Sequence, residues 1–124
     1  MEIHESAENY LETILILKRR TGAVRSIDIV NELDFAKPSV SVAMKKLRES
    51  GHILTDEEGY ITLTDKGREV AERMYERHTF ISDYLVALGV NEKTAVEDAC
   101  RIEHVISEES FNKLREHVNK ERVK

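Results

Sequence analysis

The order of elements between residues 26 and 63 constrains the fold of this chain more than any other feature. Two stretches, 26–33 and 37 to about 50, place apolar residues at helical spacing, and the second opens with Lys37-Pro38. Proline suits the first turn of a helix, because its missing N–H would have no partner there. Two short helices joined by residues 34–36 are typical of a helix-turn-helix, although helical bundles also contain such pairs.

The two apolar runs that follow predict a β-hairpin. Residues 52–55 and 60–63 alternate or run apolar, and they flank the turn cluster Asp-Glu-Glu-Gly at 56–59. A hairpin directly after the second helix is the order of a winged helix-turn-helix, which is more specific than the helix pair alone. Because the hairpin tip is acidic, we expect it to contribute little to the binding of phosphate.

The rest of the chain is predicted to be helical. Helices are expected from about Ser6 to Thr21, at about 66–88, from 92 to about 106, and from about Ser107 onward. The candidate N-caps are Ser6, Ser26, Thr64 or Asp65, and Asn91. We therefore predict a mainly α protein, with an N-terminal winged helix-turn-helix DNA-binding domain at 1–65 and a helical second domain at 66–124.

Composition and charge bear on where the chain acts and what it binds. It has one cysteine, no apolar run approaching about 20 residues, and an acidic N-terminus unlike a signal peptide, so we expect a cytoplasmic protein without membrane contact. The net charge of -5 argues weakly against nucleic acid, but binding follows local charge, and 37–48 is basic. The residues expected to contact double-stranded DNA are Ser26, Lys37, Pro38, Ser39, Ser41, Val42, Lys45 and Lys46.

The stretch 97–107 holds the cysteine together with two other metal-ligating side chains. Cys100, Glu103 and His104 stand at positions i, i+3 and i+4, so a helix would place them on one face. A thiolate, a carboxylate and an imidazole could bind a transition metal, although such triplets also arise by chance. The chain has no His-Glu-x-x-His, no Cys-x-x-Cys and no glycine-rich phosphate loop. Nothing here indicates an enzyme or a small organic substrate.

Several motifs along the chain resemble one known family. They are Ser-Ala-Glu-Asn-Tyr-Leu-Glu at 6–12, Arg-His at 77–78, Leu-Gly-Val at 88–90, and Glu-Asp-Ala-Cys-Arg-Ile-Glu-His-Val-Ile-Ser at 97–107. Together they resemble the metal-dependent repressors typified by the diphtheria toxin repressor and the manganese transport regulator. The last motif is similar to the iron-responsive branch. The chain length resembles the manganese branch, so we expect the two-domain form without the SH3-like domain.

The resemblance implies a mixed set of metal ligands. Cys100 matches the iron-responsive branch, and Glu12 matches a carboxylate ligand of the manganese branch. Asn9 falls where the manganese branch has Asp and the iron branch has Met. Its uncharged amide oxygen binds metal more weakly than a carboxylate does. The complete implied set is Asn9, Glu12, His78, Cys100, Glu103 and His104.

Chemistry and resemblance together give an expected metal and function. Thiolate and imidazole favour softer metals, while carboxylates accept Fe(II) and Mn(II). We expect Fe(II), with Mn(II) as the alternative, and binding of Co(II), Ni(II) or Zn(II) in vitro. The resemblance implies a homodimer that represses metal-uptake genes from a palindromic operator. In that dimer, metal bound between the two domains would fix the spacing of the DNA-binding heads.

Two other functions remain open at this point. One is a winged-helix regulator that senses oxidation through Cys100, and the other is a metal-binding protein without DNA-binding activity. The apolar residues that could form a dimer interface, or equally an internal core, are Val86, Val105, Ile106, Phe111 and Leu114.

Overall fold

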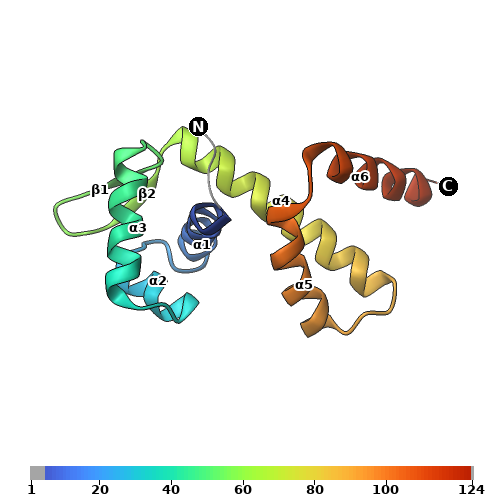
Figure 1. Cartoon of the computed structure of the whole chain (residues 1–124), viewed down its shortest axis with the longest axis horizontal. Helices are drawn as coiled ribbons and strands as arrows, with labels where there is room; N and C mark the ends of the chain where they lie inside the picture. The colour runs from blue at the N-terminus through green and yellow to red at the C-terminus, as the bar shows by residue number, and fades with distance from the viewer. Residues whose placement is uncertain (1–4, 124) are drawn as a thin grey trace. The chain divides into compact units, whose positions relative to one another are not determined.

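The computed structural model describes residues 5–123, which divide into two compact units between Met74 and Tyr75. We call these the N-terminal unit and the C-terminal unit. The elements in chain order (Figure 1) are α1 Glu5–Thr21, α2 Ser26–Leu33, α3 Lys37–Glu49, β1 Ile53–Thr55, β2 Ile61–Leu63, α4 Asp65–Ala87, α5 Glu92–Val105 and α6 Glu108–Val123. The predicted class, mainly α with an N-terminal winged helix-turn-helix, is confirmed.

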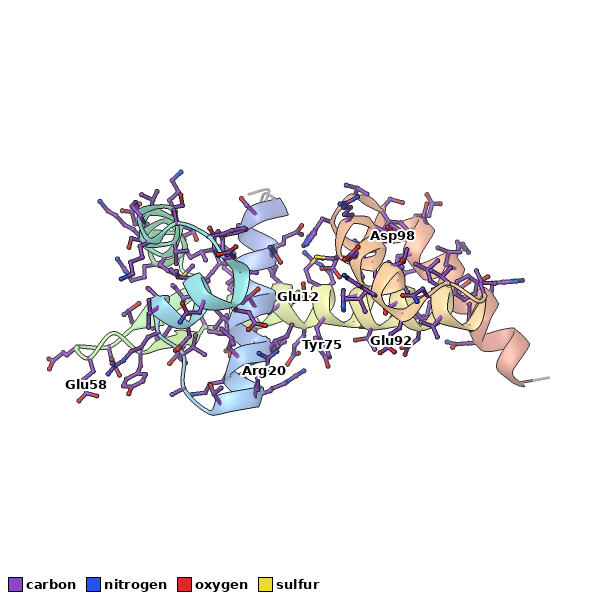
Figure 2. The ribbon with its side chains drawn as sticks, turned by 90° about the horizontal axis from the view of Figure 1, so that it is seen from below. Glu12, Arg20, Glu58, Tyr75, Glu92 and Asp98 are labelled. Atoms are coloured by element: carbon purple, nitrogen blue, oxygen red, sulfur yellow. The ribbon has the colours of Figure 1, made fainter. Side chains whose placement is uncertain are left out.

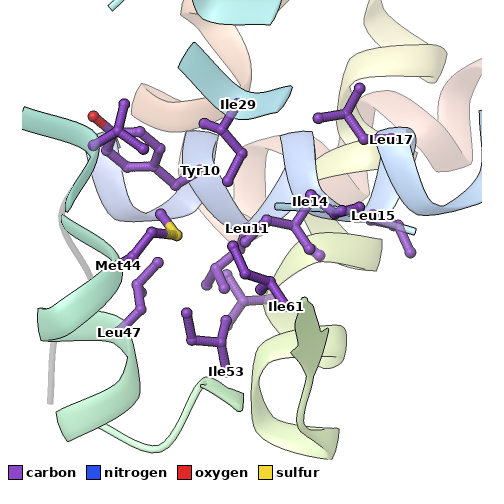
Figure 3. Packing of buried hydrophobic residues seen from close by; sticks show 14 residues of the cluster. Tyr10, Leu11, Ile14, Leu15, Leu17, Ile29, Met44, Leu47, Ile53 and Ile61 are labelled. Atoms are coloured by element: carbon purple, nitrogen blue, oxygen red, sulfur yellow. The ribbon is translucent and has the colours of Figure 1, made fainter. Parts of the chain in front are cut away.

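The core of the N-terminal unit surrounds α1. Leu11 and Ile14 are at most 1% exposed, and they stand three positions apart on this helix. Side chains from α2, α3 and the hairpin, among them Ile29, Met44 and Ile53, complete the same cluster (Figure 3). Burial of one such side chain contributes about 1.5–3 kcal/mol. The cluster therefore fixes the helix-turn-helix and the hairpin around α1.

Local backbone chemistry sets the bounds of α2 and α3. The backbone N–H of Arg25 donates to the carboxylate of Asp28 at 2.8 Å, so Arg25 is the N-cap of α2 and the predicted cap Ser26 is already helical. Asp34 ends α2 in the left-handed region with φ 55 and reverses the chain direction. Pro38 lies in the first turn of α3, as predicted.

The hairpin has the form of a wing. Its strands pair antiparallel, with Ile53 opposite Leu63. The side chain of Asp56 accepts the backbone N–H groups of Glu58 and Tyr60, each at 2.9 Å, and this closes the turn. Figure 2 shows Glu58 at the tip of the wing.

The C-terminal unit comprises the second part of α4 together with α5 and α6. Its buried apolar cluster contains Ile81, Ala99 and Phe111, and the rings of Phe80 and Phe111 pack edge to face at 5.5 Å. The side chain of Asn91 accepts the N–H of residue 93 and caps α5, as predicted. None of the helices within residues 5–123 combines the length and apolar character that a membrane span needs.

The apolar residues considered for a dimer interface separate into two groups. Phe111 is 3% exposed and Ile106 packs against the same cluster, so both belong to the internal core. Val86, Val105 and Leu114 are 43%, 74% and 41% exposed. Only these last three remain available for contact with a second subunit.

Candidate metal centre and DNA interface

A buried carboxylate, Glu103, lies at the centre of the candidate metal site. Its side chain is 0% exposed, with Oε2 3.1 Å from Nδ1 of His78 and Oε1 3.2 Å from Nε2 of His104. A carboxylate in a protein interior is costly unless a proton, a cation or a hydrogen-bond donor accompanies it. Two imidazoles and a carboxylate also form a donor set that divalent transition metals accept. The residues present therefore fit a metal ion.

Two helices of the C-terminal unit bring these side chains together. His78 lies in the middle of α4, whereas Glu103 and His104 lie in the last turn of α5. The helix dipole places partial negative charge at that end, so a cation is favoured beside these residues. On the preceding turns of α5, Ala95 and Ala99 are both 0% exposed, and their small side chains allow close packing within the unit.

Arg77 is a residue of this region to which the sequence patterns assigned no role. It is 7% exposed, and its Nη1 donates to the backbone oxygens of Glu103 at 3.1 Å and Ile106 at 3.0 Å. Every residue has a backbone oxygen, so a hydrogen bond to one does not require a particular residue type at a particular spacing in the sequence. The sequence signal for Arg77 is its place in the Arg-His pair at 77–78, one of the motifs that carry the resemblance.

Cys100 lies one turn before the Glu103-His104 pair on α5, and it is half-buried. All three residues are helical, as their spacing predicted, so they share one face of α5. The predicted role of Cys100 as a ligand stays a prediction.

Asn9 and Glu12 lie on α1, within the N-terminal unit. They are three positions apart, so they share one face of this helix. Glu12 is only 4% exposed, which is uncommon for a carboxylate, and Asn9 is half-buried. Both have side chains that can bind metal through oxygen. Their participation in the metal site stays a prediction.

The helix α3 has an apolar buried face and a basic exposed face. Val40, Met44 and Leu47 are at most 5% exposed and join the core. The residues of α3 predicted to contact DNA are all exposed, namely Lys37, Pro38, Ser39, Ser41, Val42, Lys45 and Lys46. Ser26, at the start of α2, is half-buried. The second helix of a helix-turn-helix is the one that enters the major groove of DNA.

The fold and the two regions together define a class of protein. A winged helix-turn-helix with an exposed basic helix is a DNA-binding architecture. The helical unit that follows carries a buried carboxylate between two imidazoles. These are the parts of a metal-dependent transcriptional regulator.

Comparison with known proteins identifies the family. Residues 2–60 match the iron dependent repressor N-terminal DNA binding domain, and residues 64–123 match the iron dependent repressor metal binding and dimerisation domain. The chain belongs to this family of metal-dependent repressors, and it contains both domains. The resemblance read from the sequence motifs is thereby confirmed.

Individual relatives agree with this assignment. An uncharacterised HTH-type transcriptional regulator of Methanocaldococcus jannaschii is 35% identical over 113 residues, which cover 90% of each chain. The transcriptional regulator MntR of Escherichia coli O6:H1 is 32% identical over 111 residues, which cover 90% of this chain and 72% of that protein. The solved structure of the manganese regulator SloR has a TM-score of 0.81 at 28% identity. The match covers 96% of this chain and 55% of that one, so this chain spans about half of its length.

Proposed function

We propose that this protein is a metal-activated repressor of metal-uptake genes that binds a palindromic operator as a homodimer in the cytoplasm. The observation that carries the proposal is the fully buried Glu103, within 3.2 Å of imidazole nitrogens of both His78 and His104. It lies in the part of the chain that matches a metal binding and dimerisation domain. Three further residues complete the proposed ligand set, namely Asn9, Glu12 and Cys100.

The proposed effector is Fe(II), with Mn(II) as the alternative. The thiolate of Cys100 favours a metal softer than manganese, while Glu12 and Glu103 supply oxygen ligands that both ions accept. The alternative is supported by SloR, which is named a manganese regulator. Co(II) and Ni(II) should bind in vitro, because the affinity of such a site rises from Mn(II) toward Cu(II), and Zn(II) should bind because thiolate and imidazole ligands suit it.

The proposed ligands come from both units, so metal binding could influence the DNA-binding helix α3. Glu12 lies on α1, the helix around which Met44 and Leu47 of α3 pack. A metal bound by these ligands would supply positive charge that compensates the buried carboxylates of Glu12 and Glu103. Ligand residues on α1, α4 and α5 would then favour one arrangement of α3, because a ligand shifts a protein toward the state that it binds better.

On DNA, the exposed face of α3 is proposed to enter the major groove. Val42 and Pro38 can contact thymine methyl groups, and Ser39 can bond to base edges. Lys45 and Lys46 are placed for phosphate. In a homodimer the two copies of α3 would read half-sites about one helical turn apart, or a multiple of that distance, which accounts for a palindromic operator.

The test is DNA binding under anaerobic conditions with chelator, Fe(II), Mn(II), Co(II) or Zn(II). Metal should raise the affinity for operator DNA. Fe(II) or Mn(II) should do so at the free metal concentrations that a cell supplies. His78→Ala should lose this response, whereas His117→Ala, which removes an exposed histidine of α6, should keep it. Equal affinity in chelator and in every metal would refute the proposal.

Cys100→Ser separates metal sensing from oxidation sensing. We expect the variant to bind Zn(II) and Co(II) more weakly, because it loses a soft ligand, while Mn(II) is affected least. If metal-dependent DNA binding were intact and a response to peroxide were lost instead, oxidation sensing would be the better assignment.

A further inference from the structure

We infer that Arg77 is a positioning residue of the metal site. It anchors the last turn of α5 and thereby sets where Glu103 and His104 present their ligand atoms beside His78. The inference rests on the proposed function, because it concerns residues that we propose as metal ligands.

The helix α5 ends directly after the ligand pair, so its backbone needs partners from elsewhere. The last carbonyl groups of a helix lack intrahelical donors, and Ile106 has already left the helix with φ -73 and ψ 137. Nη1 of Arg77 donates to the oxygens of Glu103 and Ile106 at 3.1 and 3.0 Å. A guanidinium is also favoured at this end by the helix dipole. Arg77 thus donates hydrogen bonds to backbone oxygens at the end of α5 that have no donor within the helix.

Glu103 is consequently held at two points by consecutive residues of α4. Arg77 binds its backbone oxygen, and Nδ1 of His78 lies 3.1 Å from its carboxylate. One contact fixes the position of the residue, and the second fixes the direction of its side chain. Because His104 follows Glu103 directly, the same anchored turn also sets the position of its imidazole.

The guanidinium of Arg77 is itself well fixed. Its Cζ lies 5.3 Å from the centroid of the Phe111 ring, a distance at which cation–π attraction acts. Arg115 offers a matched control, since its Cζ lies 5.4 Å from the same ring. Arg115 instead donates to Glu76 and Asn112. It therefore shares the aromatic contact with Arg77 but not the bonds to the end of α5.

The test compares Arg77→Met with Arg115→Met in the full chain, with Mn(II) and Co(II) as probes. Arg77→Met should bind metal about 10- to 100-fold more weakly, as when other residues that orient ligands are removed. Arg115→Met should stay within about fivefold, the most that an exposed ion pair contributes. The visible absorption spectrum of bound Co(II) should change only in Arg77→Met, because that spectrum reports ligand geometry and not global stability.

A second comparison asks whether Arg77 acts through Glu103. In a Glu103→Gln background, the loss caused by Arg77→Met should be smaller, because coupled residues are not additive, and the loss that remains reports the position of His104. The inference is overturned by an unchanged affinity and spectrum in Arg77→Met, by an equal loss in Arg115→Met, or by an undiminished loss in the Glu103→Gln background.

Two further outcomes are distinguishable. If circular dichroism shows that Arg77→Met does not fold, Arg77→Lys replaces it. An ammonium lacks the planar fork of a guanidinium, so an intermediate loss of affinity is expected, and full affinity overturns the inference. If the unaltered protein binds neither Mn(II) nor Co(II), the proposed function itself fails.

Discussion

The N-terminal unit has a continuous apolar core of 14 buried residues, whereas the buried apolar cluster of the C-terminal unit consists of Ile81, Ala99 and Phe111. Among the residues that the structure describes, the smaller cluster of the C-terminal unit is accompanied by two buried charged residues, Arg77 and Glu103, whereas the larger core of the N-terminal unit is accompanied by one, Glu12. Apolar burial stabilises a fold whether or not a ligand is present. A buried carboxylate stabilises it only when its charge is compensated.

The difference between the two units indicates a division of roles. The unit that carries the DNA-binding helix should keep its fold with or without metal. The order of the C-terminal unit should depend more on metal, because its apolar cluster is small and its buried Glu103 lies beside the imidazoles of His78 and His104. Each of the following predictions tests one side of this contrast, from the largest expected effect to the smallest.

Leu11→Ala tests the apolar side of the contrast. Leu11 is 0% exposed, so the substitution should lower the free energy of unfolding by about 2–5 kcal/mol. Urea denaturation should give the same decrease with and without metal. Leu54→Ala, at a side chain that is 64% exposed, should stay within about 0.5 kcal/mol. A metal-dependent effect of Leu11→Ala would contradict the division of roles.

His78→Ala tests the polar side. At a concentration 100 times its dissociation constant, metal should stabilise the unaltered protein by about 2.7 kcal/mol. His78→Ala should lose most of this stabilisation, because one of the imidazoles beside Glu103 is removed. Thermal denaturation with and without Mn(II) measures the difference, and His117→Ala is the control. Full metal stabilisation of His78→Ala would exclude His78 from the site.

Gly67→Ala tests how tightly the N-terminal unit packs. Alanine usually stabilises a helix interior relative to glycine, but here a Cβ would collide with the backbone oxygen of His52. We expect a loss of about 1–3 kcal/mol in urea denaturation, as for other overpacked interiors. Glu69→Ala, at an exposed position of the same helix, should be close to neutral. An increase in stability for Gly67→Ala would contradict the prediction, because it would show that the backbone at the start of α4 moves to accommodate the Cβ.

His52 is a buried titratable group that gives the N-terminal unit a pH dependence between pH 7 and 5. Burial lowers the pKa of its imidazole, and the charge of Lys66 lowers it further. The unfolded chain therefore binds the proton more readily, and stability should fall as the pH drops through about 6.5 toward the lower pKa of the folded state. His52→Gln should remove this part of the dependence in urea denaturation between pH 7 and 5, and His117→Gln should not. An identical pH profile in His52→Gln would contradict the prediction.

Much of the fold was accessible from the sequence because its signals are local. The apolar spacing of α3, Pro38 and the cluster at 56–59 each act over a few residues, and they predicted the winged helix-turn-helix. The cap of α2 was predicted at the wrong residue. Ser26 is a good cap in isolation, but the carboxylate of Asp28 takes the N–H of Arg25, so the helix begins at Ser26 itself.

The candidate site was only partly accessible, because its residues are distant in the chain. Spacing alone could group Cys100, Glu103 and His104, which share one helix. It could not connect them with His78, which came from the resemblance and which the structure places 3.1 Å from Glu103. Arg77 was missed because it binds backbone oxygens, and no pattern of residue types records such a contact.

The separation of buried and exposed faces on α3 has an evolutionary consequence. Val40, Met44 and Leu47 hold the helix in place, whereas Val42 is 54% exposed and has no share in the core. Substitutions on the exposed face should change stability by no more than about 0.5 kcal/mol. A lineage of such proteins could therefore acquire new target sequences one residue at a time, while every intermediate remained folded.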